Sequence, residues 1–113
     1  MRIGELSERT GASRRSLRYY EQQGLLYSRR TGKEWREYDE DAVVRVRNIR
    51  ELLDAGLTVA DLRPLAPCLG EALDPEYCHR VLEIYNSRLT ELDRRISDLS
   101  DHRERLLGRI GNR

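Results

Sequence analysis

The apolar positions in the first quarter of the chain recur at helical spacing and are interrupted by a glycine-containing turn. Residues 3–10 predict a short helix, and Gly11 supplies the left-handed residue that ends it. Ser13 is a suitable N-cap for a second helix, which we expect to run to about Gln23. Two short helices joined by a tight turn at residues 10–12 are typical of a helix-turn-helix.

The helical period is lost between Leu25 and Tyr38. Two short runs, residues 26–27 and 35–38, flank a basic segment, residues 28–33, that contains a glycine. This arrangement predicts a small β-hairpin with a basic tip. A hairpin directly after a helix-turn-helix is typical of a winged domain, in which we expect Trp35 to be a packing residue.

A helical pattern resumes after the hairpin. Asp39 is a suitable N-cap for a helix that runs to about Ala55. The inward face of this helix is an apolar stripe of Ala42, Val43, Val46, Ile49, Leu52 and Leu53. Thr58 and Asp61 have the spacing of a capping box at the start of a fourth helix. We expect Pro64 to end or kink that helix early, because proline has no N–H to donate.

An unbroken heptad pattern follows Pro75. Its seam consists of Leu82, Tyr85, Leu89, Leu92, Ile96, Leu99, Arg103, Leu106 and Ile110, and Arg103 is the polar exception. Spacings that alternate between three and four are typical of a coiled coil. At a rise of ~1.5 Å per residue the seam is roughly 40 Å long, and nothing else in the chain could cover it. We therefore expect a second copy of the chain to pair with this helix.

These patterns predict a mostly α-helical fold with three parts. Residues 1–66 form a winged helix-turn-helix domain, residues 67–75 form a linker, and residues 76–113 form a coiled-coil dimerisation helix. The composition agrees with this division, because 38% hydrophobic and 36% charged residues suit a small domain attached to a coiled coil better than one large core.

The sequence lacks the features of a membrane or secreted protein. No apolar run approaches the ~20 residues needed to cross a bilayer, and the first residues do not resemble a signal peptide. We therefore expect a cytoplasmic protein without a membrane partner. Because thiols in the cytoplasm are kept reduced, we expect Cys68 and Cys78 to be free or functional cysteines, not a structural disulfide.

The net charge of +1 carries little information, but the distribution of charge is uneven. Between residues 13 and 36 there are seven basic residues against two acidic ones. Arg14, Arg15 and Arg18 share one face of the second helix, where a side chain can bond guanine bidentately or hold a phosphate. The alternative is a solvated face with partners along the helix, such as Glu21 for Arg18. A glycine-punctuated turn, a basic helix face and a basic hairpin together favour DNA binding.

The candidate DNA-binding residues lie on the second helix and the hairpin. They are Ser13, Arg14, Arg15, Arg18, Tyr19, Tyr20, Arg29, Arg30, Lys33, Arg36 and Tyr38.

Several blocks of this sequence resemble the MerR family of bacterial transcriptional regulators. They are Ile3-Gly4-Glu5-Leu6, Ser16-Leu17-Arg18-Tyr19-Tyr20-Glu21, Gly24-Leu25-Leu26, Arg36-Glu37-Tyr38, Ala42-Val43-Val44-Arg45-Val46 and Leu53-Asp54-Ala55-Gly56-Leu57-Thr58. The resemblance covers residues 1–65 well, and it extends to the long helix in general character.

The resemblance implies an antiparallel coiled-coil homodimer that binds an inverted repeat in promoter DNA and distorts the duplex, with RNA polymerase as a further partner. It places Arg18 and Tyr19 at DNA-contacting positions of the recognition helix. It makes Tyr20 and Tyr38 phosphate-contacting or supporting residues, and Arg36 the wing arginine.

The means of sensing a signal stays open at this point. Cys78 resembles in position the helix-start cysteine of mercury and zinc sensors, but the cysteines that those sensors place after the helix are absent. A complete zinc or mercury site needs three or four ligands, so we expect no bound metal or cofactor. Cys68 and Cys78 are either small buried residues of the linker or a site of thiol oxidation or partial metal binding.

Three other functions compete with that of a promoter-binding regulator. An architectural or excisionase-like DNA-binding protein that needs no effector is the main alternative. A coiled-coil adaptor whose first domain binds protein is disfavoured by the basic helix face. An enzyme is not expected, because the sequence contains no carboxylate pair, nucleophile–base set or phosphate-binding loop.

Overall fold

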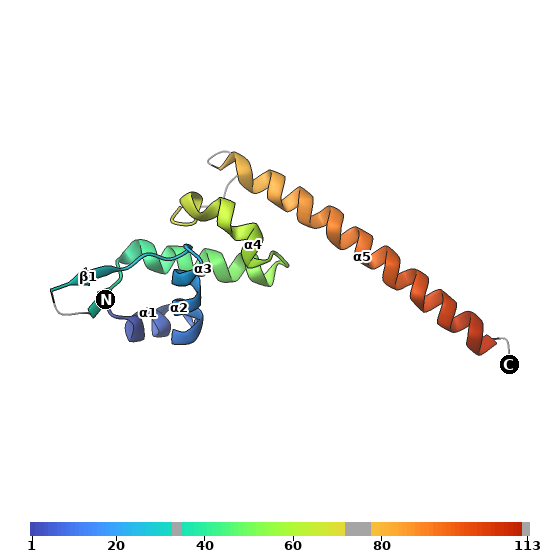
Figure 1. Ribbon diagram of the computed structural model, residues 1–113, viewed down its shortest axis with the longest axis horizontal. Coiled ribbons are helices and arrows are strands. Elements are labelled where there is room, and N and C mark those ends of the chain that lie inside the picture. The colour runs from blue at the N-terminus through green and yellow to red at the C-terminus, as the bar shows by residue number, and fades with distance from the viewer. Residues whose placement is uncertain (33–34, 72–77, 112–113) are drawn as a thin grey trace.

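The computed structural model describes residues 1–32, 35–71 and 78–111. Figure 1 shows a cluster of short elements at one end and a single long helix that extends away from it, over a longest dimension of 72 Å. In chain order the elements are α1 (Ile3–Thr10), α2 (Arg14–Gln22), β1 (Arg29–Thr31), β2 (Trp35–Glu37), α3 (Glu40–Asp54), α4 (Val59–Leu62), the 3₁₀ helix η1 (Arg63–Cys68) and α5 (His79–Gly111).

The turn between α1 and α2 is built as the sequence predicts. Gly11 ends α1 with φ 77°, a left-handed conformation that a residue with a Cβ adopts at a cost. Its N–H donates to the carbonyl oxygen of Ser7 at 2.8 Å. Ser13 then caps α2, because its Oγ accepts the N–H of Ser16 at 3.0 Å. The predicted helix-turn-helix is confirmed.

The predicted hairpin is also confirmed. β1 and β2 pair antiparallel, with Arg30 opposite Arg36. All six strand residues are exposed, so the hairpin stands out from the core as a wing (Figure 1).

Helix α3 is the centre around which the other short elements pack. Its N-cap is Asp39, whose Oδ1 accepts the N–H of Ala42 at 3.0 Å. The stripe predicted from the sequence is buried, apart from Leu53, which is partly buried. Apolar side chains from α1, α2, α4, η1 and the residues just after α2 and η1 complete the core: Leu6, Leu17, Leu25, Leu26, Leu62, Leu65 and Leu69. Burial of each leucine contributes roughly 1.5–3 kcal/mol to the free energy of folding.

Pro64 acts as its chemistry predicts. The capping box of α4 is present, with the Thr58 N–H donating to Asp61 Oδ2 at 2.9 Å and the Asp61 N–H to Thr58 Oγ1 at 3.2 Å. The α-helix ends at Leu62, and the chain continues as η1. Leu65 and Leu69 are fully buried, so the chain stays packed on the core well past Pro64.

Helix α5 has 33 residues, and its first half, up to Leu92, lies against the winged domain, where Arg88 forms an ion pair with Asp61 of α4 at 2.8 Å. Val81 is fully buried there, whereas Leu82, Leu89, Ile96, Leu99, Leu106 and Ile110 are each at least half exposed. The long helix predicted after Pro75 is therefore confirmed. Within the described ranges, no helix is long and apolar enough to cross a membrane.

The structure corrects one part of the expectation about the cysteines, because neither of them is a free thiol. Cys68 and Cys78 are joined by a disulfide, with their Cα atoms 6.2 Å apart. The end of η1 and the start of α5 both pack on the core, through Leu69 and Val81 respectively. This packing brings the two sulfurs together, although the cysteines are ten residues apart in the sequence. Hydrophobic periodicity along the chain does not indicate such a pairing.

Candidate nucleic-acid interface

One face of α2 is basic and solvent-exposed. Arg14, Arg15, Arg18 and Tyr19 lie on this face, and Leu17 on the opposite side is fully buried. Within the described residues, no ion pair joins Arg14, Arg15 or Arg18 to a carboxylate. Glu21, the partner considered for Arg18, instead binds a residue of the wing. The arginines of α2 are therefore available for a ligand outside the chain.

Glu21 connects α2 to the wing. Its Oε2 accepts from Arg36 Nη1 at 2.6 Å, and its Oε1 accepts from the Tyr38 hydroxyl at 2.9 Å. Arg36 is nevertheless still partly exposed, with 43% of its side-chain surface accessible. The ion pair holds Arg36 next to the basic face of α2 without covering it.

Two of the candidate tyrosines are core residues. Tyr20 is 7% exposed and Tyr38 is 3% exposed. Burial, followed by the hydrogen bond to Glu21, raises the pKa of Tyr38 to about 12, and burial also raises the pKa of Tyr20. Of the two roles considered for these residues, support of the interface fits their burial better than direct phosphate contact. Tyr19, at 44% exposed, is the accessible tyrosine of α2.

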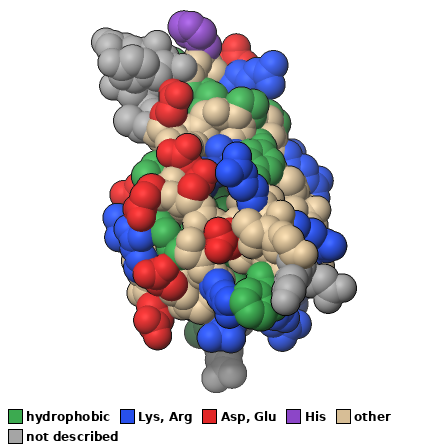
Figure 2. All heavy atoms as spheres, turned by 90° about the vertical axis from the view of Figure 1, so that its left-hand side faces the viewer, with side chains coloured by type: hydrophobic (Ala, Val, Ile, Leu, Met, Phe, Trp, Pro, Cys, Tyr) green, Lys and Arg blue, Asp and Glu red, His purple; other side chains and the backbone are tan. Residues whose placement is uncertain are grey.

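The recognition helix and the wing form the two sides of one groove. It is lined by Arg2, Ile3, Arg18, Glu21, Gln22, Trp35 and Arg36. Figure 2, which views the wing end of the molecule, shows Lys and Arg side chains gathered at the lower end of this face around a hydrophobic group. Arg29 and Arg30 are exposed on β1, while Lys33 lies outside the described residues.

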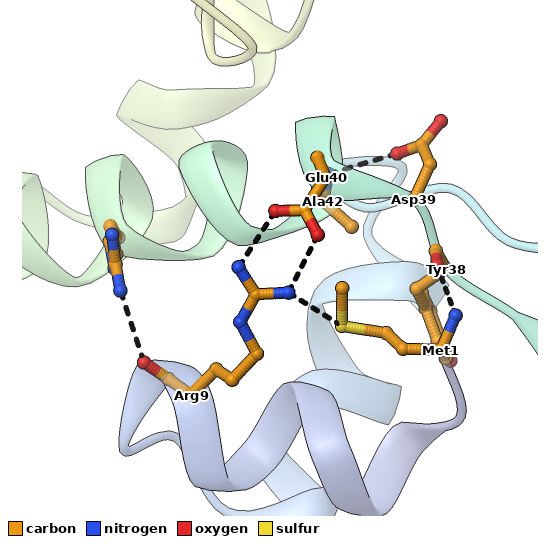
Figure 3. Close-up of polar contacts among 7 residues, drawn as sticks. Met1, Arg9, Tyr38, Asp39, Glu40 and Ala42 are labelled. Carbon is orange, nitrogen blue, oxygen red and sulfur yellow. Dashed lines mark hydrogen bonds and ion pairs between the residues drawn. The ribbon is translucent and has the colours of Figure 1, made fainter.

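The beginning of the chain anchors the wing. The Met1 amine donates to the Tyr38 carbonyl at 2.8 Å, and the Tyr38 N–H donates to the Met1 carbonyl at 2.7 Å. Arg9 adds a bidentate ion pair with Glu40, both contacts at 2.7 Å, that links α1 to α3 (Figure 3). The wing therefore leaves the domain at a position defined by α1, α3 and the first residue.

Sequence reasoning missed Arg2. Its guanidinium lies 3.6 Å from the centre of the Trp35 ring, a cation–π contact between the start of the chain and β2. Trp35, expected to be a packing residue, is 55% exposed and stacks against this cation. No periodic pattern in the sequence relates residue 2 to residue 35, so tertiary packing alone brings Arg2 into the groove.

Sequence reasoning also missed Arg45, the one buried charged residue among those described. Its Nε donates to the carbonyl oxygen of Leu25 at 3.1 Å, its Nη2 donates to that of Ala66, and its guanidinium lies 4.4 Å from the centre of the Tyr27 ring. Arg45 thereby joins the start of the wing to η1. The position of Arg45 next to the apolar stripe of the predicted helix was the one signal in the sequence that could have indicated this role.

A metal site was considered for Cys68 and Cys78. In the ranges that the structure describes, no group of three or more His, Cys, Asp or Glu side chains could hold a metal ion.

Comparisons with known proteins agree on one family. Residues 1–67 match the family model described as MerR HTH family regulatory protein. The chain is 36% identical over 106 residues to the HTH-type transcriptional regulator HmrR of Rhizobium leguminosarum bv. viciae, covering 94% of this chain and 81% of that protein. It is 30% identical over 99 residues to the mercuric resistance operon regulatory protein of Bacillus cereus, covering 87% and 74%.

A solved structure shares the whole arrangement. The transcription regulator PbrR691 from Ralstonia metallidurans CH34, determined in complex with lead(II), superimposes with a TM-score of 0.80 at 26% identity. The superposition covers 95% of this chain and 83% of that one, so it includes the long helix as well as the winged domain.

Proposed function

The chain belongs to the MerR family of helix-turn-helix regulatory proteins and is a DNA-binding transcriptional regulator, and on that premise we propose that it binds an inverted repeat in promoter DNA as a homodimer. The observation that carries the DNA-binding part of the proposal is the shared groove. Arg18 of α2 and Arg36 of the wing line its two sides, so helix and hairpin present cations in the same direction.

The two sides of the groove suit different parts of the duplex. An α-helix fits the major groove of B-DNA, where the fork of Arg18 can bond a guanine edge and Tyr19 can reach the adjacent backbone. The exposed arginines of the wing, Arg29, Arg30 and Arg36, are placed for phosphate contacts, which position the protein without reading sequence. Ser13, Arg14 and Arg15 at the start of α2 extend the phosphate-binding surface.

The exposed seam of α5 supports the homodimer. Its apolar residues repeat over four heptads, and six of them are at least half exposed in a single chain. A second α5 would cover them, and an antiparallel pair centred near Ile96 would place the two winged domains at opposite ends. That separation suits two half-sites of an inverted repeat.

We further propose that binding deforms the promoter. Two domains held apart by a stiff helical pair can bind both half-sites only if the spacing of the half-sites on the duplex matches the separation of the domains. Any bending or untwisting needed to reach that match would alter the access of RNA polymerase to the promoter.

The experiment is a footprint of the full chain on DNA upstream of its own gene, with affinities measured at several salt concentrations. One compact inverted repeat and an affinity that falls steeply with salt support the proposal. Extended cooperative coverage would favour the architectural alternative, and no footprint would favour the protein-binding adaptor. Repeating the footprint with lead(II) and mercury(II) tests whether this chain responds to the metals with which PbrR691 and the mercuric resistance regulator are associated.

A further inference from the structure

The disulfide lies at the junction between the winged domain and α5. Cys68 is the last residue of η1, and Cys78 directly precedes α5, where its carbonyl oxygen accepts the N–H of Val81 at 3.1 Å. The bond therefore ties the long helix to the winged domain at the point where the helix begins.

The two sulfurs differ in accessibility. Cys78 is 4% exposed, whereas Cys68 is only partly buried. Cys68 is therefore the more accessible of the two residues, while Cys78 is shielded in the core. This is a suitable arrangement for stepwise exchange, with one cysteine that meets the small molecule and one that resolves the intermediate.

Hydrogen bonds connect the segment around Cys68 to α3 and the wing. Asn48 Nδ2 donates to the carbonyl oxygens of Leu69 and Glu71, both at 2.8 Å. Arg45 donates to the carbonyl oxygen of Ala66, two residues before Cys68, and also to that of Leu25, which precedes the wing. Residues 66–71 are therefore hydrogen-bonded to α3, and through Arg45 the same helix is bonded to Leu25 before the wing.

We propose that Cys68 and Cys78 are a reversible thiol–disulfide site that exchanges with small-molecule disulfides and so controls how tightly α5 is held to the winged domain. This inference rests on the proposed function, because it concerns the regulation of DNA binding. Disulfides in compartments that contain DNA are opposed by a reducing thiol pool, and those that occur there are usually transient or redox-sensing.

The exchange is balanced in two steps. The Cys68 thiolate attacks one sulfur of a disulfide such as oxidised glutathione, which forms a mixed disulfide and releases one glutathione thiolate. The Cys78 thiolate then attacks the Cys68 sulfur, which forms the protein disulfide and releases the second glutathione. The protein dithiol loses two electrons and two protons, and oxidised glutathione gains them as two glutathione molecules.

The expected consequence concerns the spacing of the two half-sites. When the bond is formed, the junction is restricted, so the two winged domains of the proposed dimer are held at one separation. We expect the oxidised protein to bind an operator of the preferred spacing at least about fivefold more tightly than the reduced protein, and to lose affinity more steeply as the spacer is changed.

The test first measures the chemistry and then the binding. The full chain is equilibrated in buffers with different ratios of reduced to oxidised glutathione, and the remaining thiols are alkylated and counted by mass. DNA affinity over a series of spacer lengths is measured at both ends of the titration. The controls are Cys68→Ala and Cys78→Ala, which cannot form the bond, each checked for native helix content by circular dichroism.

The results discriminate sharply. The proposal is supported if the thiol count of the wild type changes reversibly with the glutathione ratio and its preference for spacer length changes with it. In both variants the preference for spacer length should not depend on glutathione. A disulfide that reduced glutathione cannot open, or identical spacing profiles for both redox forms of the wild type, overturns it. If neither redox form binds any operator, the proposed function has failed instead, which is a separate outcome.

Discussion

At the scale of single residues, Glu21 determines the geometry of the candidate interface. It lies on α2 directly after the block of exposed and buried aromatic residues, and it binds both Arg36 and Tyr38. An exposed ion pair alone contributes little to stability, about 0–1 kcal/mol. Glu21 is only 15% exposed, however, and its second hydrogen bond comes from a buried hydroxyl. Its main effect is to fix the wing beside the recognition helix.

Arg18 is the residue whose loss tests the recognition helix most directly. We expect Arg18→Ala to weaken binding to the footprinted operator by about 1–3 kcal/mol, roughly 5- to 150-fold, and to reduce the preference for one base in each half-site. Fluorescence anisotropy at fixed salt measures this change. Arg105→Ala is the matched control, because it removes the same charge from an exposed position of α5 outside the seam. Equal affinities for Arg18→Ala and wild type would refute the assignment.

Tyr38 makes stability depend on alkaline pH. Its pKa is raised to about 12 in the folded protein and returns to about 10 when the chain unfolds, so the unfolded state releases its proton first as pH rises. The stabilising contribution is fully present below pH ~10 and is lost as pH rises toward ~12, a loss of about 2 kcal/mol. Urea unfolding at fixed protein concentration between these pH values measures it.

The control for this pH effect is Tyr38→Phe. This variant loses the hydrogen bond to Glu21, which costs about 1 kcal/mol at neutral pH. Its free energy of unfolding should then fall less steeply with rising pH than that of the wild type. Part of the decline should persist, since burial also raises the pKa of Tyr20 and of Tyr85. A decline as steep as that of the wild type would show that Tyr38 does not titrate as described.

At the scale of the elements, α3 organises the domain. Its buried face packs against α1 and α4. Polar side chains add further contacts: Arg45 donates to Ala66 of η1, and Asn48 donates to Leu69 and Glu71, which follow η1. Arg47 and Arg50 donate to backbone carbonyl oxygens at the end of α1. Because so many contacts originate from one helix, damage to its first turn should affect the whole domain.

The N-cap of α3 can be tested separately from its packing. Asp39→Ala removes the acceptor for the Ala42 N–H and a negative charge near the helix N-terminus, and should destabilise the protein by about 1 kcal/mol. Asp39→Asn keeps an acceptor and should recover most of this loss. Thermal unfolding followed by circular dichroism compares the three proteins. Similar losses for both variants would mean that the charge of Asp39, more than its hydrogen bond, is responsible.

At the scale of the whole molecule, the chain is asymmetric in a way that one copy does not explain. The winged domain buries its leucines, while α5 exposes a row of apolar side chains along nearly its full length. At about 25 cal/mol per Å² of apolar surface, pairing with a second helix would be strongly favourable. The proposed dimer is thus the state in which both parts of the chain have a covered apolar face.

Ile96 lies at the centre of the seam, where an antiparallel pair would bring the two copies of the same residue together. We expect Ile96→Asp to convert the dimer to a monomer at micromolar concentration, because two carboxylates would face each other in an apolar interface. Sedimentation velocity measures the mass. Ser97→Asp introduces the same group one position outside the seam and should leave the dimer intact. A dimeric Ile96→Asp protein would require a different interface.

Much of the fold could be predicted because it depends on local chemistry. Gly11, Ser13, Asp39 and the Thr58–Asp61 pair act within a few residues of their own position, so their effect on helix ends can be inferred without knowledge of the rest of the chain. The heptads of α5 are likewise a property of consecutive residues. The exposed arginines of α2 followed from the same periodicity, since Leu17 identified the face that turns inward.

The tertiary structure alone decided which distant residues meet. Arg2 stacks on Trp35, Glu21 binds Arg36 and Tyr38, Arg45 spans Leu25 and Ala66, and Cys68 joins Cys78. These contacts depend on how α1, the wing, η1 and α5 pack around α3, and residue spacing along the chain does not encode that packing. The sequence by itself therefore determined the elements and the basic face of this regulator, whereas packing decided how the wing is oriented and where the two thiols combine.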